Sequence, residues 1–269
     1  MKYIGLIFFL LCGVASAAEY TLTSSPRGTE QEDRKVFEPI ADYLSAKTGE
    51  KFRYIYPRDW LTFRKTLAKN PYDVYFSDSH FASFLAVYRD QIYIARLKEW
   101  LSFAVVVRSG DKIGTIAQLA GRQNCLALEP NLGTLLFMSS FANPARQPAV
   151  MVSPSSESSF GGVVGKRCSG AVIPYAAFDK MNKNNEAFAL HMYDLVPSQA
   201  FTASKKLPPA VLEKVRTALL DATQPQIKGL LQTYASTGFA EVDPKDYETI
   251  NTILAKDYIL GSEIKKPKE

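Results

Sequence analysis

Few side chains in this sequence have the type and spacing that enzyme chemistry needs. The histidines are His80 and His191, and neither lies near a turn that would present a nucleophilic serine. The sequence has no G-x-S-x-G motif, no H-E-x-x-H motif and no phosphate-cradling P-loop. Cys125 and Cys168 do not show the spacing of metal ligands, either with each other or with the histidines. These observations indicate a protein that is not an enzyme and that uses neither a metal nor a cofactor.

The first candidate binding residues follow a predicted strand at positions 73–76. Ser77, Asp78, His80 and Phe81 lie where this strand leads into a helix. Ligands of α/β proteins bind at such strand ends, so we expect these residues to face a ligand. His80 would serve as a neutral donor or a pH-sensitive contact, and its alternative role is to cap or pack the helix.

Two aromatic residues are further candidates. Trp60 begins a predicted helix after a strand at positions 52–56, and its ring could stack on a ligand. The alternative is that Trp60 begins an apolar helix stripe with Phe63 and Leu67. Tyr175 follows another predicted strand, and its ring or hydroxyl group could also reach a ligand.

Two polar segments further along the chain complete the candidate site. Asn131, Gly133 and Thr134 lie in a predicted loop before a helix, where unbonded backbone amides would suit an anion. Gly133 would let a ligand approach the backbone. The alternative is an ordinary helix cap made by Asn131 or Thr134. Ser156 and Glu157 lie in a polar segment that its residues predict to be a surface loop, and its contact with a ligand is implied only by the family resemblance described below.

The elements that must position these residues alternate along the chain. Short apolar runs and amphipathic stretches follow each other from Tyr20 onward, which predicts an α/β protein with mostly parallel sheet. We expect strands at 20–24, 52–56, 73–76, 92–97, 101–108, 125–128, 149–152, 169–173 and 188–193. We expect helices at 30–47, from 60 to just before 70, and at 81–89, 115–120, 134–141, 160–164, 175–182, 209–222 and 246–254.

The first 17 residues have the order of a secretory signal peptide. Lys2 supplies a positive start, residues 3–14 form an uncharged apolar run, and Ala15-Ser16-Ala17 is a small-residue cleavage signal. The run is short for a membrane span, and the alternative is a buried N-terminal helix. We therefore expect export across the bacterial inner membrane, with residues 1–17 removed.

Composition and charge set further bounds. The chain has 269 residues with 46% hydrophobic and 22% charged residues, which is typical of a globular protein with one large or two ordinary domains. The formal net charge of +5 is spread along the chain without a basic arm. The charge pattern therefore predicts no nucleic-acid partner, and it is compatible with an anionic ligand or an anionic membrane surface.

An even pair of cysteines remains once residues 1–17 are removed. In an oxidising compartment, Cys125 and Cys168 are predicted to form a disulfide. The alternative is two buried thiols that each pack as a small apolar side chain.

The order of these motifs resembles the phosphonate-type periplasmic substrate-binding proteins of ABC importers, within the type II periplasmic binding protein fold. Together the stretches that carry the resemblance cover most of the chain after residue 17. They are Pro26-Arg27-Gly28 with residues 36–49; residues 72–77 with His80-Phe81-Ala82; residues 119–122 with 128–134; and residues 197–202 with 207–209, 237–239 and Asp246-Tyr247.

The resemblance implies two Rossmann-like α/β lobes joined by two crossing strands. Lobe one would comprise residues 18–101 plus 197–269, and lobe two would comprise residues 102–196. A small molecule would bind between the lobes, which would close by a hinge motion. In the family, the segment around residue 132 is richer in hydroxyl groups, and a histidine stands near the position of Ser156; this chain has Leu132 and Ser156 there.

The resemblance also implies a function and a location. We expect a periplasmic monomer that closes on a small polar or anionic ligand of the phosphonate or phosphate kind. An inner-membrane ABC permease would receive the ligand. The alternative is a ligand sensor, or an accessory protein of a membrane kinase or a periplasmic redox enzyme, using the same cleft.

Overall fold

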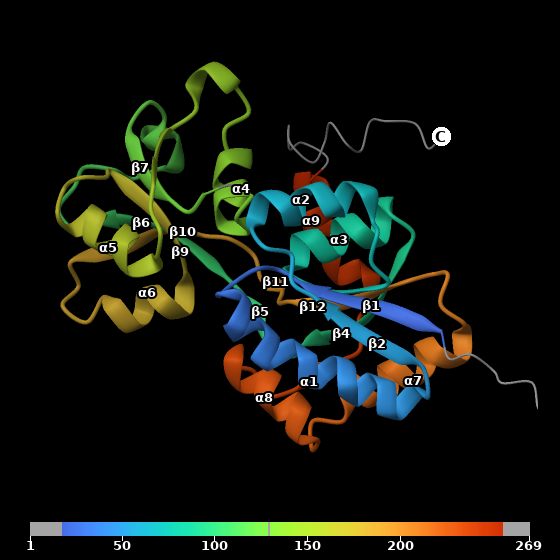
Figure 1. Cartoon of the computed structure of the whole chain (residues 1–269). Helices are drawn as coiled ribbons and strands as arrows, with labels where there is room; N and C mark the ends of the chain where they lie inside the picture. The colour runs from blue at the N-terminus through green and yellow to red at the C-terminus, as the bar shows by residue number, and fades with distance from the viewer. Residues whose placement is uncertain (1–17, 129, 255–269) are drawn as a thin grey trace, which may run out of the picture.

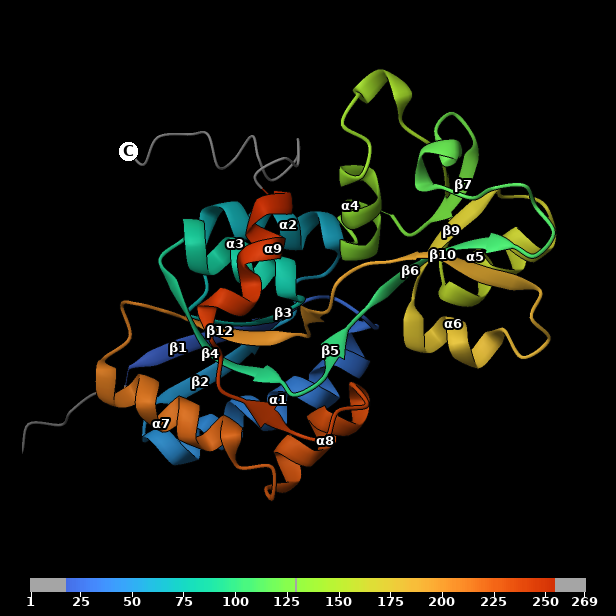
Figure 2. The same ribbon diagram turned by 180° about the vertical axis from the view of Figure 1, so that it is seen from behind.

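The computed structural model describes residues 18–128 and 130–254 of the chain. The predicted signal peptide at residues 1–17 lies outside the described residues. No helix in the described ranges has both the length and the apolar character needed to cross a membrane. The described chain forms two sheets, each covered by helices, with a short two-stranded ribbon between them (Figures 1 and 2).

The larger sheet has six strands and forms the centre of what we call lobe one. Strand β1 lies parallel to both β2 and β3, whereas β12 lies antiparallel between β3 and β4. Strand β13 extends the sheet on the other side of β4. The six strands are β1 (Glu19–Ser24), β2 (Lys51–Ile55), β3 (Val74–Ser77), β4 (Gln91–Leu97), β12 (Ala200–Ser204) and β13 (Phe239–Ala240).

Helices cover both faces of this sheet. One face carries α1 (Glu30–Thr48), α7 (Pro209–Leu220) and α8 (Pro225–Thr233), whose apolar residues form one buried core with the strands. The other face carries α2 (Trp60–Lys69), α3 (Ser79–Tyr88) and α9 (Glu248–Leu254). Figure 1 shows these two helix layers below and above the sheet.

The smaller sheet has five strands and forms the centre of what we call lobe two. Strand β7 lies parallel to β8 and β9, and β6 lies antiparallel to β9 and β10. The strands are β6 (Phe103–Arg108), β7 (Gln123–Leu126), β8 (Ala149–Val152), β9 (Gly170–Pro174) and β10 (Ala187–Met192). The helices are α4 (Leu132–Ser139), α5 (Ser156–Val164) and α6 (Tyr175–Met181), with short 3-10 turns η1 (Ile116–Leu119) and η2 (Pro144–Arg146).

The chain passes twice between the sheets. Strand β5 (Trp100–Leu101) leads out of lobe one, and β11 (Val196–Pro197) leads back and pairs with it in antiparallel fashion. The predicted two-lobed α/β fold with two crossing segments is confirmed. The exact lobe boundaries, 18–101 plus 197–269 and 102–196, stay a prediction.

One apolar core runs from lobe one into lobe two. It contains Phe81 and Phe84 of α3 together with Leu132, Leu136 and Phe137 of α4. In both views α4 lies beside the α2 and α9 side of lobe one. The lobes are therefore in apolar contact along α4 and are joined by more than the two crossing segments.

Several sequence predictions about the elements are wrong in detail. Both sheets are mixed rather than mostly parallel. In lobe one β12 lies antiparallel to β3 and β4, and in lobe two β6 lies antiparallel to β9 and β10. The helices α4 and α5 begin at Leu132 and Ser156, earlier than predicted. The side chains of Asn131 and Ser155 cap these helices by accepting from the backbone amides of the residues three positions later. Helix α8 and strand β13 were not predicted.

The disulfide between Cys125 and Cys168 is present, with 5.6 Å between the two Cα atoms. Cys125 lies in β7, and Cys168 lies in the turn between α5 and β9. Strands β7 and β9 are parallel neighbours, which brings the two side chains together. The sequence prediction of a disulfide here is confirmed.

Gly162 offers a direct test of this packing. A Cβ atom at Gly162 would lie 2.5 Å from Sγ of Cys125, whereas a Cβ at Gly161 on the same helix would meet nothing within 4 Å. We expect Gly162→Ala to lower the free energy of unfolding by about 1 to 3 kcal/mol, as overpacked core substitutions do. Gly161→Ala should leave it unchanged or raise it by up to about 1 kcal/mol, through helix propensity alone. Urea denaturation of both variants measures the difference, and equal stabilities would contradict the described packing.

Candidate ligand-binding site

The candidate site lies at the strand ends of the six-stranded sheet, on the side that faces lobe two. Strands β1 and β3 run parallel and end beside each other, with Ser24 paired to Phe76. Ala200 at the start of the antiparallel β12 pairs with Ser77 at the end of β3. Polar residues far apart in the sequence therefore meet where these three strands end or begin. Figure 1 shows this edge of the sheet turned toward lobe two.

Asp78 lies at the centre of the polar contacts at this edge. Its carboxylate accepts hydrogen bonds from Nη2 of Arg27 and, at 3.0 Å, from Nε2 of Gln199. Although Asp78 precedes α3, its side chain makes no capping hydrogen bond to that helix. Burial works to raise the pKa of Asp78, but the Arg27 charge, His80 and the Gln199 amide outweigh it, so the pKa is lowered. Asp78 is therefore a mostly buried carboxylate whose charge is compensated by Arg27.

Arg27 is held on several sides. Besides its ion pair with Asp78, its guanidinium carbon lies 5.5 Å from the centroid of the Tyr234 ring at the end of α8. Its backbone amide donates to the carboxylate of Asp33 at 3.4 Å. The Arg27 side chain is nevertheless 44% exposed, whereas that of Asp78 is 15% exposed. Arg27 thus presents an oriented, solvent-accessible guanidinium group at the strand ends.

The Asp78 titration tests this network. Asp78 should titrate below the ordinary aspartate value of about 3.9, so its contribution to stability is complete above that pH and is lost as pH falls through the lower native pKa. In Arg27→Gln the pKa should rise, because the burial remains while the cation is gone. Carbon-13 NMR of the aspartate carboxyl groups measures both values. Arg58→Gln is the control, since Arg58 contacts Asp59 and Thr62 instead; an unmoved Asp78 pKa in Arg27→Gln would refute the pairing.

The other predicted residues of this segment are mostly buried. Ser77 is fully buried in β3, and His80 is 2% exposed in the first turn of α3. The His80 ring centroid lies 3.9 Å from that of Phe81. Phe81 itself is buried and packs edge-on against Phe63 at 5.4 Å between ring centroids. Contact of these residues with a ligand stays a prediction.

Trp60 belongs to the predicted apolar stripe, and its contact with a ligand stays a prediction. Its ring lies 6.0 Å from Phe81 and 6.1 Å from Phe63, so one side belongs to the apolar stripe. The residue is also 40% exposed, so the remainder is accessible at the start of α2. Packing against the core holds the ring in place for a stacking contact.

The predicted residues of α4 lie in its capped first turn. Oδ1 of Asn131 accepts from the Thr134 amide at 3.3 Å, and the Thr134 hydroxyl donates to the Ala127 carbonyl at 2.8 Å. A Cβ atom at Gly133 would lie 2.7 Å from Cδ1 of Phe103, so close helix packing alone already requires glycine there. Leu132 is buried in the core that joins the lobes. The predicted loop is wrong from Leu132 onward, and the alternative of a helix cap made by Asn131 is confirmed. Contact of this turn with a ligand stays a prediction.

Ser156, Glu157 and Tyr175 lie at the corresponding edge of lobe two. Ser156 and Glu157 form the first turn of α5, after β8, and Tyr175 starts α6 directly after β9. Strands β8 and β9 flank β7 in parallel, so these residues and Asn131 all follow the carboxyl ends of strands. Glu157 is exposed, and Tyr175 is 39% exposed. The structure thus brings the predicted lobe-two residues to one edge of the sheet.

Arg27 and Gln199 were missed as site residues by the sequence reasoning. Arg27 was noted only in the Pro26-Arg27-Gly28 stretch that carries the family resemblance, and Gln199 lies 121 residues from Asp78. Only the antiparallel placement of β12 beside β3 brings Gln199 to Asp78. The one available signal was the position of Arg27 directly after the first strand.

Comparisons with known proteins place the chain in a family. The model of the family described as "ABC transporter, phosphonate, periplasmic substrate-binding protein" matches residues 22–247. A comparison with curated proteins gave no match. The matched residues include both sheets and both crossings.

Solved structures of similar fold agree with this match. XAC2383 from Xanthomonas citri, bound to ATP, has a TM-score of 0.73 at 13% identity, over 94% of this chain and 100% of that one. PhnD1 from Prochlorococcus marinus, in complex with methylphosphonate, has a TM-score of 0.65 at 13% identity, over 88% and 97%. A binding protein component of an ABC phosphonate transporter from Pseudomonas aeruginosa has a TM-score of 0.63 at 13% identity, over 92% and 89%.

At these identities the solved structures establish the fold, which is that of the type II periplasmic binding proteins. The family follows from the sequence match over residues 22–247, and it agrees with the resemblance found in the sequence motifs. This chain belongs to the phosphonate-type periplasmic substrate-binding proteins of ABC transporters.

Proposed function

We propose that this protein is a periplasmic receptor that binds a small oxyanion between its lobes and delivers it to an ABC permease. The observation that carries the proposal is the exposed guanidinium of Arg27, held at the strand ends by Asp78. The proposed role involves no catalytic step. We further propose that residues 1–17 are removed on export and that the receptor acts as a monomer.

Arg27 has the chemistry that an oxyanion needs. A guanidinium group carries five N–H donors in a fixed plane, and the contact with Asp78 leaves donors to spare. Phosphonate, phosphate and sulfonate groups offer acceptor oxygens that suit such a donor set. Because the charge of Asp78 is compensated by Arg27 and its carboxylate also accepts from Gln199, it repels an incoming anion only weakly.

Lobe two would complete the site from the opposite side. Ser156, Glu157 and Tyr175 follow its strand ends, and Tyr175 is accessible for a ring or hydroxyl contact. Leu132 occupies the position where the family has more hydroxyl groups, and it is buried. We therefore propose that the free N–H donors of Arg27 hold the anion from lobe one, with the Trp60 ring packing beside it.

The relatives narrow the ligand class. PhnD1 is described with methylphosphonate, and SsuA from Escherichia coli, with a TM-score of 0.53, is described as an aliphatic sulphonate binding protein. XAC2383 is described with ATP, which carries phosphate groups on a larger aromatic molecule. A phosphonate, phosphate or sulfonate group is the chemistry these ligands share, and it suits Arg27.

A ligand screen on the protein beginning at residue 18 tests the proposal. Thermal shift and calorimetry would compare methylphosphonate, phosphate, methanesulfonate and ATP, with small carboxylates and amines as contrasts. An oxyanion at a hundred times its dissociation constant should add about 2.7 kcal/mol to the free energy of unfolding. Binding of amines alone would remove the anion assignment. Absence of any ligand, together with binding to a kinase or oxidoreductase encoded nearby, would favour the sensor or accessory role.

A further inference from the structure

A second group of basic side chains lies at the opposite end of lobe two. A hollow of about 320 Å³ lies there, and its lining residues include Arg108, Asp111, Lys112, Arg122, Lys166 and Ser169. These residues lie at or near the end of β6 and the beginnings of β7 and β9. The candidate ligand-binding residues follow the other ends of β7 and β9, so the hollow is separate from them.

Positive charge exceeds negative charge in this hollow. Asp111 is its one acidic lining residue, and its carboxylate is already paired with Arg108. The ion pairs found among residues 18–128 and 130–254 include none for Lys112, Arg122 or Lys166. Three cations around one small hollow repel each other, and an anion between them would remove that repulsion.

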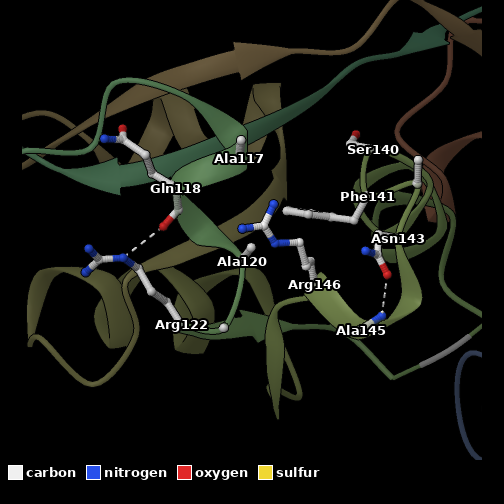
Figure 3. A pocket seen from close by; sticks show the side chains of 11 residues that line it. Ala117, Gln118, Ala120, Arg122, Ser140, Phe141, Asn143, Ala145 and Arg146 are labelled. Carbon is white, nitrogen blue, oxygen red and sulfur yellow. Dashed lines mark hydrogen bonds between the residues drawn. The ribbon is translucent and has the colours of Figure 1, made fainter.

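The walls of the hollow are held in place without a ligand. The amides of Arg167 and Cys168 both donate to the Gly162 carbonyl, at 2.8 and 3.0 Å, and Cys168 is bonded to Cys125 of β7. Nε of Arg122 donates to the Gln118 carbonyl at 2.8 Å (Figure 3). The turn that contains Lys166 and the Nε atom of Arg122 are therefore already held in position before a ligand binds.

Lys166 occupies a backbone conformation that favours glycine. Its φ angle is +63°, in the left-handed region, where a residue with a Cβ atom costs of order 1 kcal/mol. A cation after α5 also interacts favourably with the carbonyl end of that helix. The interaction with the end of α5 accounts for a positive charge at Lys166. It does not account for those at Lys112, which follows β6, and Arg122, which follows η1.

A larger hollow adjoins the first and shares Arg122 with it. It measures about 800 Å³ and lies between η1 and the connection from α4 to β8. Figure 3 shows the guanidinium of Arg146 beside the ring of Phe141, and the residues lining this hollow include no acidic one. A phosphate held in the small hollow can therefore belong to a larger molecule that extends past Arg122.

We propose that this end of lobe two binds a phosphate group, independently of the ligand between the lobes. Lys112, Arg122 and Lys166 supply the charge, and Ser169 supplies a hydroxyl group. The phosphate would come either from a free phosphate in the periplasm or from the headgroup of an anionic phospholipid.

The test removes three positive charges from the hollow and compares the result with removal of three positive charges from lobe one. The variant is Lys112→Gln with Arg122→Gln and Lys166→Gln. The control is Lys205→Gln with Lys206→Gln and Lys228→Gln, which removes the same charge from exposed positions of lobe one. Both sets are made with Arg27→Gln, so that binding between the lobes does not mask the second site.

One arm titrates inorganic phosphate and follows the amide NMR signals. The other measures sedimentation with vesicles of phosphatidylglycerol and phosphatidylcholine at low salt.

We expect the control to bind phosphate or vesicles and the lobe-two variant to bind them with at least tenfold lower affinity. Shifted amide signals should include those of residues 108–112, 122 and 166–169. Binding of phosphate alone identifies a free ligand, and binding of vesicles alone identifies the headgroup. Equal binding by variant and control, or no binding in either arm, overturns the proposal.

Discussion

Replacing Arg27 by glutamine is expected to weaken oxyanion binding by about 30- to 150-fold. The loss follows from a charge-assisted hydrogen bond to the ligand, worth about 2 to 3 kcal/mol. Glutamine keeps a polar side chain of similar reach but has no charge, and it leaves Asp78 buried without its ion-pair partner. Calorimetry with the oxyanion that binds the unchanged protein best measures the ratio of dissociation constants.

Two further variants separate the roles of Arg27 and Asp78. Arg27→Lys keeps the charge but loses the planar donor set, so it should recover only part of the affinity. Asp78→Asn should weaken binding less than Arg27→Gln, because Asp78 orients the guanidinium and does not itself hold the ligand. Arg58→Gln removes a 79% exposed arginine near the same edge and should leave affinity unchanged. An Arg27→Gln protein that is folded and binds as tightly as the unchanged one would exclude Arg27 from the site.

Removing the disulfide is expected to cost about 4 kcal/mol of stability. The bridge joins residues 43 positions apart, and the entropy of closing such a loop in the unfolded chain sets the size of the effect. For a protein of this size the loss corresponds to a fall of roughly 8 to 16 °C in Tm. Cys125→Ala with Cys168→Ala is the preferred variant, because both sulfurs lie in an apolar core with Val163 and Phe178.

Differential scanning calorimetry under oxidising and reducing conditions checks this result. Reductant should lower the Tm of the unchanged protein toward that of the double variant, while the double variant itself should not respond. A fall of less than about 1 kcal/mol in the free energy of unfolding would contradict the prediction, because it would mean that the bridge does not restrict the unfolded chain. Because the disulfide lies within lobe two, affinity for the oxyanion at Arg27 should change far less than stability.

The sequence predicted the parts of this molecule that depend on local patterns. Apolar runs and amphipathic stretches located most strands and helices, and the cysteine count in an expected exported chain predicted the disulfide. The glycine at 133 was noticed for ligand approach, whereas its close packing on Phe103 depends on a strand 30 residues earlier. Local patterns also placed two helix starts too late: the cap by Asn131 was considered only as an alternative, and the cap by Ser155 was not recognised.

The rest depends on how distant segments pair. The position of β12 between β3 and β4 is set only after the chain has returned from lobe two, and no local pattern states its direction. The contacts of Asp78 with Arg27 and Gln199 follow from that pairing. The basic hollow likewise joins residues from 108 to 169, which share no motif in the sequence.

The apolar contact along α4 has a consequence for the path of the hinge motion. Separating the lobes at this side would expose apolar side chains such as Leu132, and burial of such a side chain contributes about 1.5 to 3 kcal/mol. We therefore expect α4 to stay against lobe one while the lobes close on a ligand, so that lobe two pivots on this contact as well as on the two crossing segments.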